Sequence, residues 1–215
     1  MEFQDFPKMA RLSRTVTVTE KLDGTNAQIH IVDLAATVST AESRAYLDTY
    51  ALYVKGDLVM LAGSRSKYLS VGKDGVKGGD NFGFAKWTCD NAADLMGLGV
   101  GRHYGEWWGS GIQRGYGLTD GEKRFSLFNT SRWADDRDRE KYPQGRPSCC
   151  GVVPVMYRGP FDMGKVDAAL FYLSTVGSVA APGFMKPEGV VVFHEAAGVS
   201  FKKTIEKDDE HKGGR

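Results

Sequence analysis

Cysteine is scarce in this sequence of 215 residues, which contains only Cys89, Cys149 and Cys150. An odd number of cysteines, two of them adjacent, argues against a disulfide framework. There is no Cys-x-x-Cys pair, and the cysteines and histidines lack the spacing of a local metal site. The first residues, MEFQDFPKMARL, are mixed and charged, unlike a secretory signal peptide. We therefore expect a protein of the reducing cytoplasm.

Long apolar runs and a large net charge are also absent. No apolar run approaches the ~20 residues that cross a bilayer, so we expect no membrane partner. The 28 basic residues (Lys and Arg) balance 27 acidic residues, which gives a formal net charge of +1. This balance excludes a histone-like basic binder but allows a local basic cleft. The length suits one large domain, and we expect a single domain over residues 1–215.

Short alternating segments and many glycines predict a sheet-rich protein rather than a helix bundle. Asp23-Gly24 separates two alternating segments and is typical of a hairpin turn. Apolar residues recur at the helical period over 84–96 and 162–176, and Asp162 is a candidate N-cap. Antiparallel strands with two helices between them predict an α+β fold. The expected strands are 15–19, 26–32, a hairpin over 51–62 with its turn at 55–57, 103–108, 124–129, 151–157, 189–194 and 199–205, and the expected loops are 66–81 and 131–148.

The motif with the clearest chemical meaning is Glu20-Lys21-Leu22-Asp23-Gly24-Thr25-Asn26, between two expected strands. A plain hairpin turn with an exposed lysine is the alternative interpretation. A lysine can act as a nucleophile toward a nucleotide phosphate if its amine is neutral and in line with the leaving group. Nearby cations favour the neutral amine and stabilise the charge that develops on the phosphate. Such a site also needs carboxylates for a metal and the ribose, and an aromatic side chain for the base.

Residues with these properties follow the motif in order along the chain. A glutamate lies in a segment of aromatics, a phenylalanine lies near the end of another strand, and a second glutamate opens an apolar strand. That is an unusual place for a purely structural charge. Each residue has a structural alternative, such as a core position for the phenylalanine or a solvated surface for the lysines, so the evidence is their joint order. The six residues are Arg65, Glu106, Phe128, Glu188, Lys202 and Lys203.

This series resembles the covalent nucleotidyltransferases, which include ATP-dependent DNA and RNA ligases and messenger-RNA capping enzymes. The resemblance covers about residues 16–205 and implies an α+β adenylyltransferase domain of two antiparallel sheets with flanking helices and a nucleotide cleft between them. It implies that Lys21 takes the nucleotide, Glu106 binds the ribose and Phe128 stacks on the base. It also implies ATP and Mg²⁺ or Mn²⁺ as cofactors, with the metal linked to Glu188 directly or through water. The other nucleotide-binding residues that it implies are Glu20, Asp23, Gly24, Asn26, Arg65, Lys202 and Lys203.

Two features are similar to the RNA ligases of the phage and kinetoplastid-editing type. One is Asn26, where capping enzymes and most DNA ligases carry arginine, and the other is the segment GEWWGSGIQR over residues 105–114. Such an enzyme would form a lysyl-AMP, pass the AMP to an RNA 5′-phosphate and join that end to a 3′-hydroxyl with release of AMP. The alternatives are a DNA ligase, a capping-type guanylyltransferase and a non-catalytic module that binds nucleotides or RNA ends. The presence of Lys21, Glu106 and Glu188 argues against the non-catalytic module.

The sequence departs from this family near its end. Its last lysines are adjacent, where the family usually has Lys-x-Lys, and only residues 206–215 follow Ile205. We therefore expect no accessory C-terminal domain and modest, salt-sensitive RNA binding. The sequence does not decide whether the RNA substrate is a nicked duplex, a single strand or an RNA–DNA hybrid. It does not give the oligomeric state either.

The two final lysines should lie on opposite faces of their strand, because side chains alternate along a strand. Lys203 shares a face with Val199 and Phe201, which we expect to pack against a sheet or helix. Lys202 shares the small polar face with Ser200. The pattern therefore favours Lys202 as the main phosphate ligand and Lys203 as a secondary one.

Overall fold

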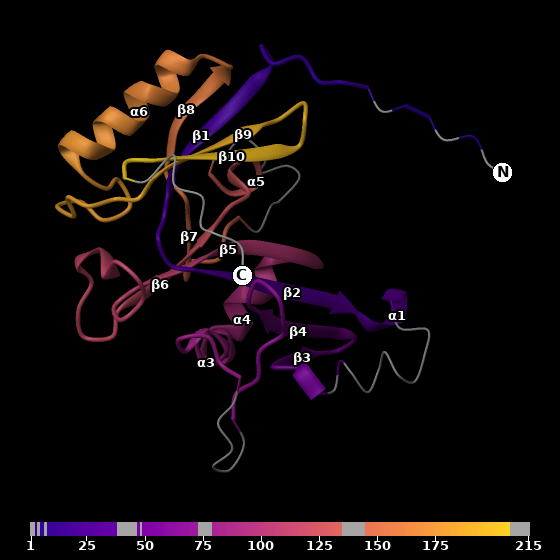
Figure 1. Ribbon diagram of the computed structural model, residues 1–215. Helices are drawn as coiled ribbons and strands as arrows, with labels where there is room; N and C mark the ends of the chain where they lie inside the picture. Colours follow the sequence, from indigo (N-terminus) through magenta and orange to yellow (C-terminus); the bar gives the residue numbers. More distant parts are fainter. Residues whose placement is uncertain are drawn as a thin grey trace. The chain divides into compact units, whose positions relative to one another are not determined.

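The computed structural model describes residues 3, 5–6, 8–37, 47, 49–72, 79–134 and 145–206 (Figure 1). The chain forms two compact units. The terminal unit consists of Met1–Leu22 and Pro154–Arg215, and the central unit consists of Asp23–Val153. Each unit has its own sheet and its own core, and the boundary between them falls inside the Glu20–Asn26 motif.

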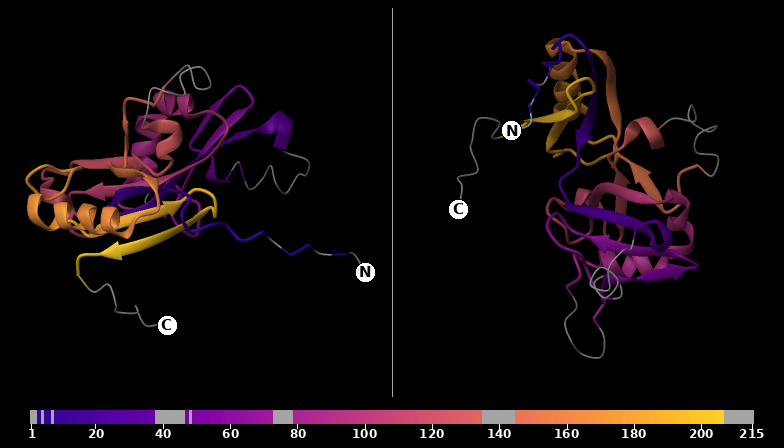
Figure 2. Two further views of the ribbon diagram at one scale, coloured as in Figure 1. Left: turned by 90° about the horizontal axis from the view of Figure 1, so that it is seen from above. Right: turned by 90° about the vertical axis from the view of Figure 1, so that its right-hand side faces the viewer.

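The terminal unit contains a four-stranded antiparallel sheet in the order β10-β9-β1-β8. Its strands are β1 (Thr15–Lys21), β8 (Val155–Pro160), β9 (Gly189–His194) and β10 (Val199–Thr204). Helix α6 (Met163–Val176) packs on one face, and its N-cap Asp162 accepts a hydrogen bond from Gly164 N. The β9–β10 hairpin, yellow in Figure 2, forms one edge of this sheet. The core between α6 and the sheet consists of Val16, Val18, Val166, Ala169, Leu173, Val190 and Val192.

The central unit contains a six-stranded sheet in the order β3-β4-β2-β5-β6-β7, in which β7 runs parallel to β6 and the other pairs are antiparallel. One face carries the larger core, against α3 and α4, and includes Ala27, Ile29 and Ile31 of β2. Because side chains alternate along a strand, Asn26 and Gln28 lie on the opposite face. The elements are β2 (Thr25–Asp33), α1 (Leu34–Thr37), β3 (Tyr53–Lys55), β4 (Leu58–Gly63), α3 (Phe84–Asp90), α4 (Ala92–Leu95), η1 (Met96–Leu98), β5 (Gly101–Gly109), η2 (Gly115–Gly117), β6 (Lys123–Leu127), α5 (Thr130–Trp133) and β7 (Cys150–Val152).

The predicted α+β class and most predicted strands are confirmed, but the hairpin at Asp23-Gly24 is wrong. Strand β1 pairs with β8 and β9, whereas β2 pairs with β4 and β5 in the other sheet. The single strand predicted over 151–157 is also wrong, since β7 and β8 belong to different sheets. The hairpins β3–β4 and β9–β10 are confirmed. Local alternation therefore located the strands but not always their partners.

The two predicted helices are present, with one interruption. Residues 84–96 form α3 and α4, separated at Asn91, and a 3₁₀ turn follows, while 162–176 corresponds to α6. The predicted loop over 131–148 begins inside α5, and its residues 135–144 lie outside the described part, as do residues 73–78 of the loop predicted over 66–81. The three cysteines are free thiols. In the described ranges, no helix is both long and apolar enough to span a membrane.

Candidate active site

Lys21 and Glu188 form an ion pair in the terminal unit. Lys21 is the last residue of β1 and lies opposite Gly189, the first residue of β9. Its Nζ is 2.5 Å from Glu188 Oε2, and the two side chains are only 25% and 16% exposed. The amine of the motif and the carboxylate that precedes β9 are 167 residues apart in the sequence. The fold therefore brings together two residues that the sequence analysis assigned to one site.

The sheet register separates the two final lysines. Directly opposite residues share a sheet face. Lys202 lies opposite Val191, which lies opposite Thr19 of β1, so Lys202 is on the same face as Lys21. Lys203 is on the face that α6 covers.

Lys203 is held on that face by an ion pair with α6. Its Nζ is 2.7 Å from Asp167 Oδ1. The predicted alternation of the two lysines is therefore confirmed. The prediction that Val199 and Phe201, on the face of Lys203, pack against a sheet or helix is wrong. They are 45% and 60% exposed, because β10 is an edge strand.

Glu20 is a buried carboxylate on the α6 side of β1. Its oxygens accept hydrogen bonds from Ser178 Oγ at 2.5 Å and from Val179 N and Ala180 N, both at 2.9 Å. Burial raises the pKa of Glu20, and the three hydrogen bonds oppose this shift. Glu20 thus fastens the segment after α6 to β1, and its side chain lies on the face opposite to Lys21.

Glu106 is the centre of a hydrogen-bonded group in the central unit. It lies on β5, 8% exposed and opposite Asn26 of β2. Its Oε1 accepts from Gly24 N at 3.1 Å, and its Oε2 accepts from Asn26 Nδ2 at 3.1 Å. This carboxylate fixes the chain where the motif enters β2.

Gly24 approaches β5 so closely that no side chain fits. A Cβ at this position would lie 2.4 Å from Trp107 O and 2.8 Å from Trp108 Cβ. Two residues that the sequence analysis did not assign to the site hold the neighbouring Asp23. Arg114 Nε donates to Asp23 Oδ2 at 3.0 Å, and Asp23 N donates to Tyr116 Oη at 3.0 Å. The motif is therefore fixed by contacts on both its backbone and its side chains.

The loop that supplies Arg114 and Tyr116 is rich in glycine and has an uncommon backbone. Gln113 and Tyr116 have positive φ values of 43° and 52°, a region that residues other than glycine rarely adopt. Tyr116 is nevertheless buried and packs edge-on against Trp108 at 5.2 Å between centroids. The density of glycines over residues 109–117 is the sequence signal that could have indicated this loop.

Phe128 and Arg65 lie at the ends of strands of the central unit. Phe128 follows β6, donates its backbone N–H to Tyr104 O at 2.9 Å and is 41% exposed, so it is not a core residue. By the register, its side chain lies on the same sheet face as Glu106. Arg65 is exposed in the turn that follows β4, in which Ser64 N donates to Lys67 O. An accessible ring and an accessible guanidinium are thus present in this unit.

Metal ligands are sparse in the described ranges, where no group of three or more His, Cys, Asp or Glu side chains could hold an ion. Glu188 alone still fits a Mg²⁺ or Mn²⁺ ion that takes its other ligands from water and substrate phosphates. Mg²⁺ is commonly bound in this way, by one or two carboxylates together with phosphate oxygens.

Comparisons with known proteins give the family and the fold of the chain. The RNA ligase family matches residues 14–204 of the chain. Similar solved structures include two substituted forms of the Naegleria gruberi RNA ligase with ATP and Mn. One is 16% identical with a TM-score of 0.53 and covers 91% of this chain and 51% of that chain. The other is 17% identical with a TM-score of 0.52 and covers 94% of this chain and 53% of that chain.

A third substituted form of that ligase, with AMP and Mn, is 16% identical with a TM-score of 0.52 and covers 90% of this chain and 50% of that chain. The present chain therefore spans about half the length of these Naegleria gruberi chains. None of the curated proteins matches it. The fold is the α+β fold of nucleotidyltransferase-type RNA ligases. The chain belongs to the RNA ligase family.

The close approach of Gly24 to β5 predicts that Gly24→Ala is destabilising. Overpacking of this kind typically costs about 1–3 kcal/mol, and the obstructing atoms here include backbone. Urea denaturation should show the loss. Gly79→Ala is the matched control, because among the described residues only Lys67 Nζ, at 3.7 Å, lies near its new Cβ. Equal midpoints for the two variants would contradict the constraint on Gly24.

Proposed function

We propose that this chain is an ATP-dependent RNA ligase that joins a 3′-hydroxyl to a 5′-phosphate through a lysyl-AMP on Lys21. The observation that carries the proposal is the Lys21–Glu188 ion pair in a member of the RNA ligase family. This ion pair places the amine of the Lys-x-Asp-Gly motif next to a carboxylate that can also bind a metal ion. The Naegleria gruberi structures with ATP and Mn support the choice of nucleotide and of a divalent metal.

In the first step, Lys21 Nζ attacks the α-phosphorus of ATP. A P–N bond forms, and the P–O bond to pyrophosphate breaks. The amine must lose a proton, which passes to water, before it attacks. Cations that replace Glu188 as the neighbours of Lys21 favour the neutral amine. Lys202, on the same sheet face as Lys21, then stabilises the negative charge of the phosphates.

The later steps use the stored AMP. An oxygen of the RNA 5′-phosphate attacks the phosphorus of lysyl-AMP, so that a P–O–P anhydride forms and the P–N bond to Lys21 breaks. The RNA 3′-hydroxyl then attacks the 5′-phosphate and releases AMP. No atom of Lys21 stays with the product, and the enzyme is ready for another ATP.

We assign the base and the ribose of ATP to residues of the central unit. Phe128 stacks on adenine, which agrees with its 41% exposure. Glu106 binds the ribose, and Asn26 and Gly24 keep that carboxylate in place. Arg65 binds phosphate.

Glu188 would hold the divalent metal together with the triphosphate. The bound ion supplies charge neutralisation for the phosphate oxygens. Asp23 remains with Arg114, which balances its charge and keeps the motif ordered.

Incubation with each α-³²P-labelled nucleoside triphosphate and Mg²⁺, followed by a denaturing gel, tests this function. We expect label from ATP only, no label in Lys21→Ala, and joining of RNA rather than DNA ends by the unsubstituted chain. Label from GTP would instead identify a capping-type enzyme, and joining of DNA alone would identify a DNA ligase. Nucleotide binding without any covalent label would leave only the non-catalytic module.

The sheet register predicts different effects for the two final lysines. Lys202→Ala should slow formation of lysyl-AMP at least ~10-fold, or about 1.4 kcal/mol, because it removes a cation from the Lys21 face. Lys203→Ala should stay within a few-fold of the unsubstituted chain, since Lys203 pairs with Asp167 on the other face. Single-turnover rates measure the ranking, with circular dichroism to confirm folding. The reverse ranking would refute the assignment of faces.

A further inference from the structure

A group of polar and aromatic side chains continues the Glu106 face of the six-stranded sheet toward the start of β5. Gln28 lies opposite Tyr104, and His30 lies opposite Arg102, so these four residues share that face. Tyr68 packs over this end of the sheet from the segment after β4. We call Gln28, His30, Tyr68, Arg102 and Tyr104 the outer patch.

Contacts within the outer patch hold its arginine in place. The rings of His30 and Tyr68 are stacked with 6.0 Å between centroids, and His30 Nδ1 is 2.6 Å from Tyr68 Oη. The Arg102 guanidinium lies 5.8 Å from the centroid of Tyr68, and one of its nitrogens donates to Gln28 Oε1 at 3.1 Å. Arg102 is exposed but positioned, which lowers the entropic cost of binding an anion.

The positive charge of the outer patch comes from Arg102 rather than from His30. Burial and the nearby Arg102 lower the pKa of His30 to about 4, so this imidazole is neutral at pH 7. Gln28 Nε2 also donates to Ser64 O, which connects the patch to the turn that carries the exposed Arg65. The patch is therefore cationic at neutral pH and adjoins a second cation.

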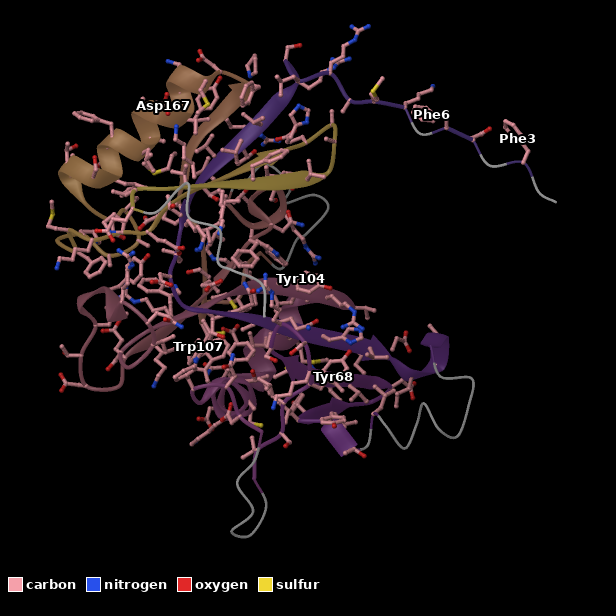
Figure 3. The ribbon with its side chains drawn as sticks, in the orientation of Figure 1. Phe3, Phe6, Tyr68, Tyr104, Trp107 and Asp167 are labelled. Carbon is pink, nitrogen blue, oxygen red and sulfur yellow. The ribbon has the colours of Figure 1, made fainter. Side chains whose placement is uncertain are left out.

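Tyr104 is the exposed aromatic residue of the outer patch. It is 53% exposed, whereas Trp107, which points to the other face of β5, is 2% exposed (Figure 3). The backbone oxygen of Tyr104 accepts a hydrogen bond from Phe128 N, so an accessible aromatic residue on β5 neighbours another that directly follows β6. Arg102 is four residues from Glu106, or ~13 Å along β5.

We propose that the outer patch binds the RNA strand that is being joined, with Tyr104 stacked on a base and Arg102 paired with a phosphate; this inference rests on the proposed function. An exposed ring beside a fixed cation matches the chemistry of single-stranded RNA, which offers base faces and phosphates at regular intervals. The location also fits, since the patch continues the face to which the nucleotide is assigned.

Binding of a fluorescent, 5′-phosphorylated single-stranded RNA, measured by anisotropy over a range of salt concentrations, tests the inference. Tyr104→Ala and Arg102→Ala should each weaken RNA binding at least ~5-fold. The logarithmic salt slope should fall by about 0.7 for Arg102→Ala only, because that variant alone loses a phosphate contact. The matched controls are Lys55→Ala, which removes an exposed cation from β3, and Tyr172→Ala, which removes a half-exposed ring from α6. Both should bind RNA like the unsubstituted chain.

Formation of lysyl-AMP from ATP alone, measured on the same proteins, separates this inference from the proposed function. In Tyr104→Ala and Arg102→Ala the loss of RNA affinity should exceed the loss of lysyl-AMP formation at least ~5-fold, whereas Phe128→Ala should lose lysyl-AMP formation more than RNA affinity. Unchanged RNA affinity in both patch variants, equal losses in the two assays, or no RNA binding by the unsubstituted chain would overturn the inference. Failure to form lysyl-AMP would refute the proposed function, and the anisotropy would still decide whether the patch binds RNA.

Discussion

The packing of Gly24 against β5 is the constraint on which the candidate site depends. Strand β1 ends at Lys21 and β2 begins at Thr25, so only three residues connect strands of two different sheets. A Cβ on Gly24 would collide with the backbone of Trp107, and Gly24 N is held by Glu106. The connection that follows Lys21, the proposed nucleophile, is therefore short and is firmly held at its Gly24 end. The glycine of Lys-x-Asp-Gly is thus required by the packing against β5, whereas the lysine is required by the proposed chemistry.

The candidate site contains two pairs of opposite charges. Lys21 pairs with Glu188, and Asp23 pairs with Arg114. Part-buried charges such as these need partners, because desolvation of an isolated charge is costly. In the proposed reaction, phosphates and a metal would take over the Lys21–Glu188 pair, while the Asp23–Arg114 pair persists. In this proposal the first pair is the reactive one, and the second keeps the motif ordered.

The strands could largely be predicted from the sequence, because alternation with a period of two is a local property. Their partners could not, since pairing depends on distant residues. Asp23-Gly24 is a strong hairpin signal, and yet the strands that it separates belong to different sheets. Likewise, alternation separated Lys202 from Lys203, but only the register through β9 relates Lys202 to Lys21. Phe201 was expected to pack, because its sequence does not reveal that β10 is an edge strand.

Most of the candidate site was predicted because its residues are chemically distinctive. Lys21, Glu188 and Glu106 each stand out as charges beside apolar or aromatic strands, and the structure gives two of them direct contact with each other. Arg114 and Tyr116 were not assigned to the site, since their positions depend on an irregular loop with positive φ values rather than on a periodic pattern. The proposed role of Tyr104 could not be predicted for another reason. The segment that contains Tyr104, Trp107 and Trp108 does not indicate which of its aromatic side chains is exposed.

The identity of the modified residue tests the central claim most directly. The unsubstituted chain would be incubated with ATP and Mg²⁺, digested and examined by tandem mass spectrometry for peptides that carry AMP. We expect a single site of modification, at Lys21, in the peptide that contains Leu22-Asp23-Gly24. AMP on any other residue, or no covalent AMP in a folded protein that binds ATP, would contradict the account.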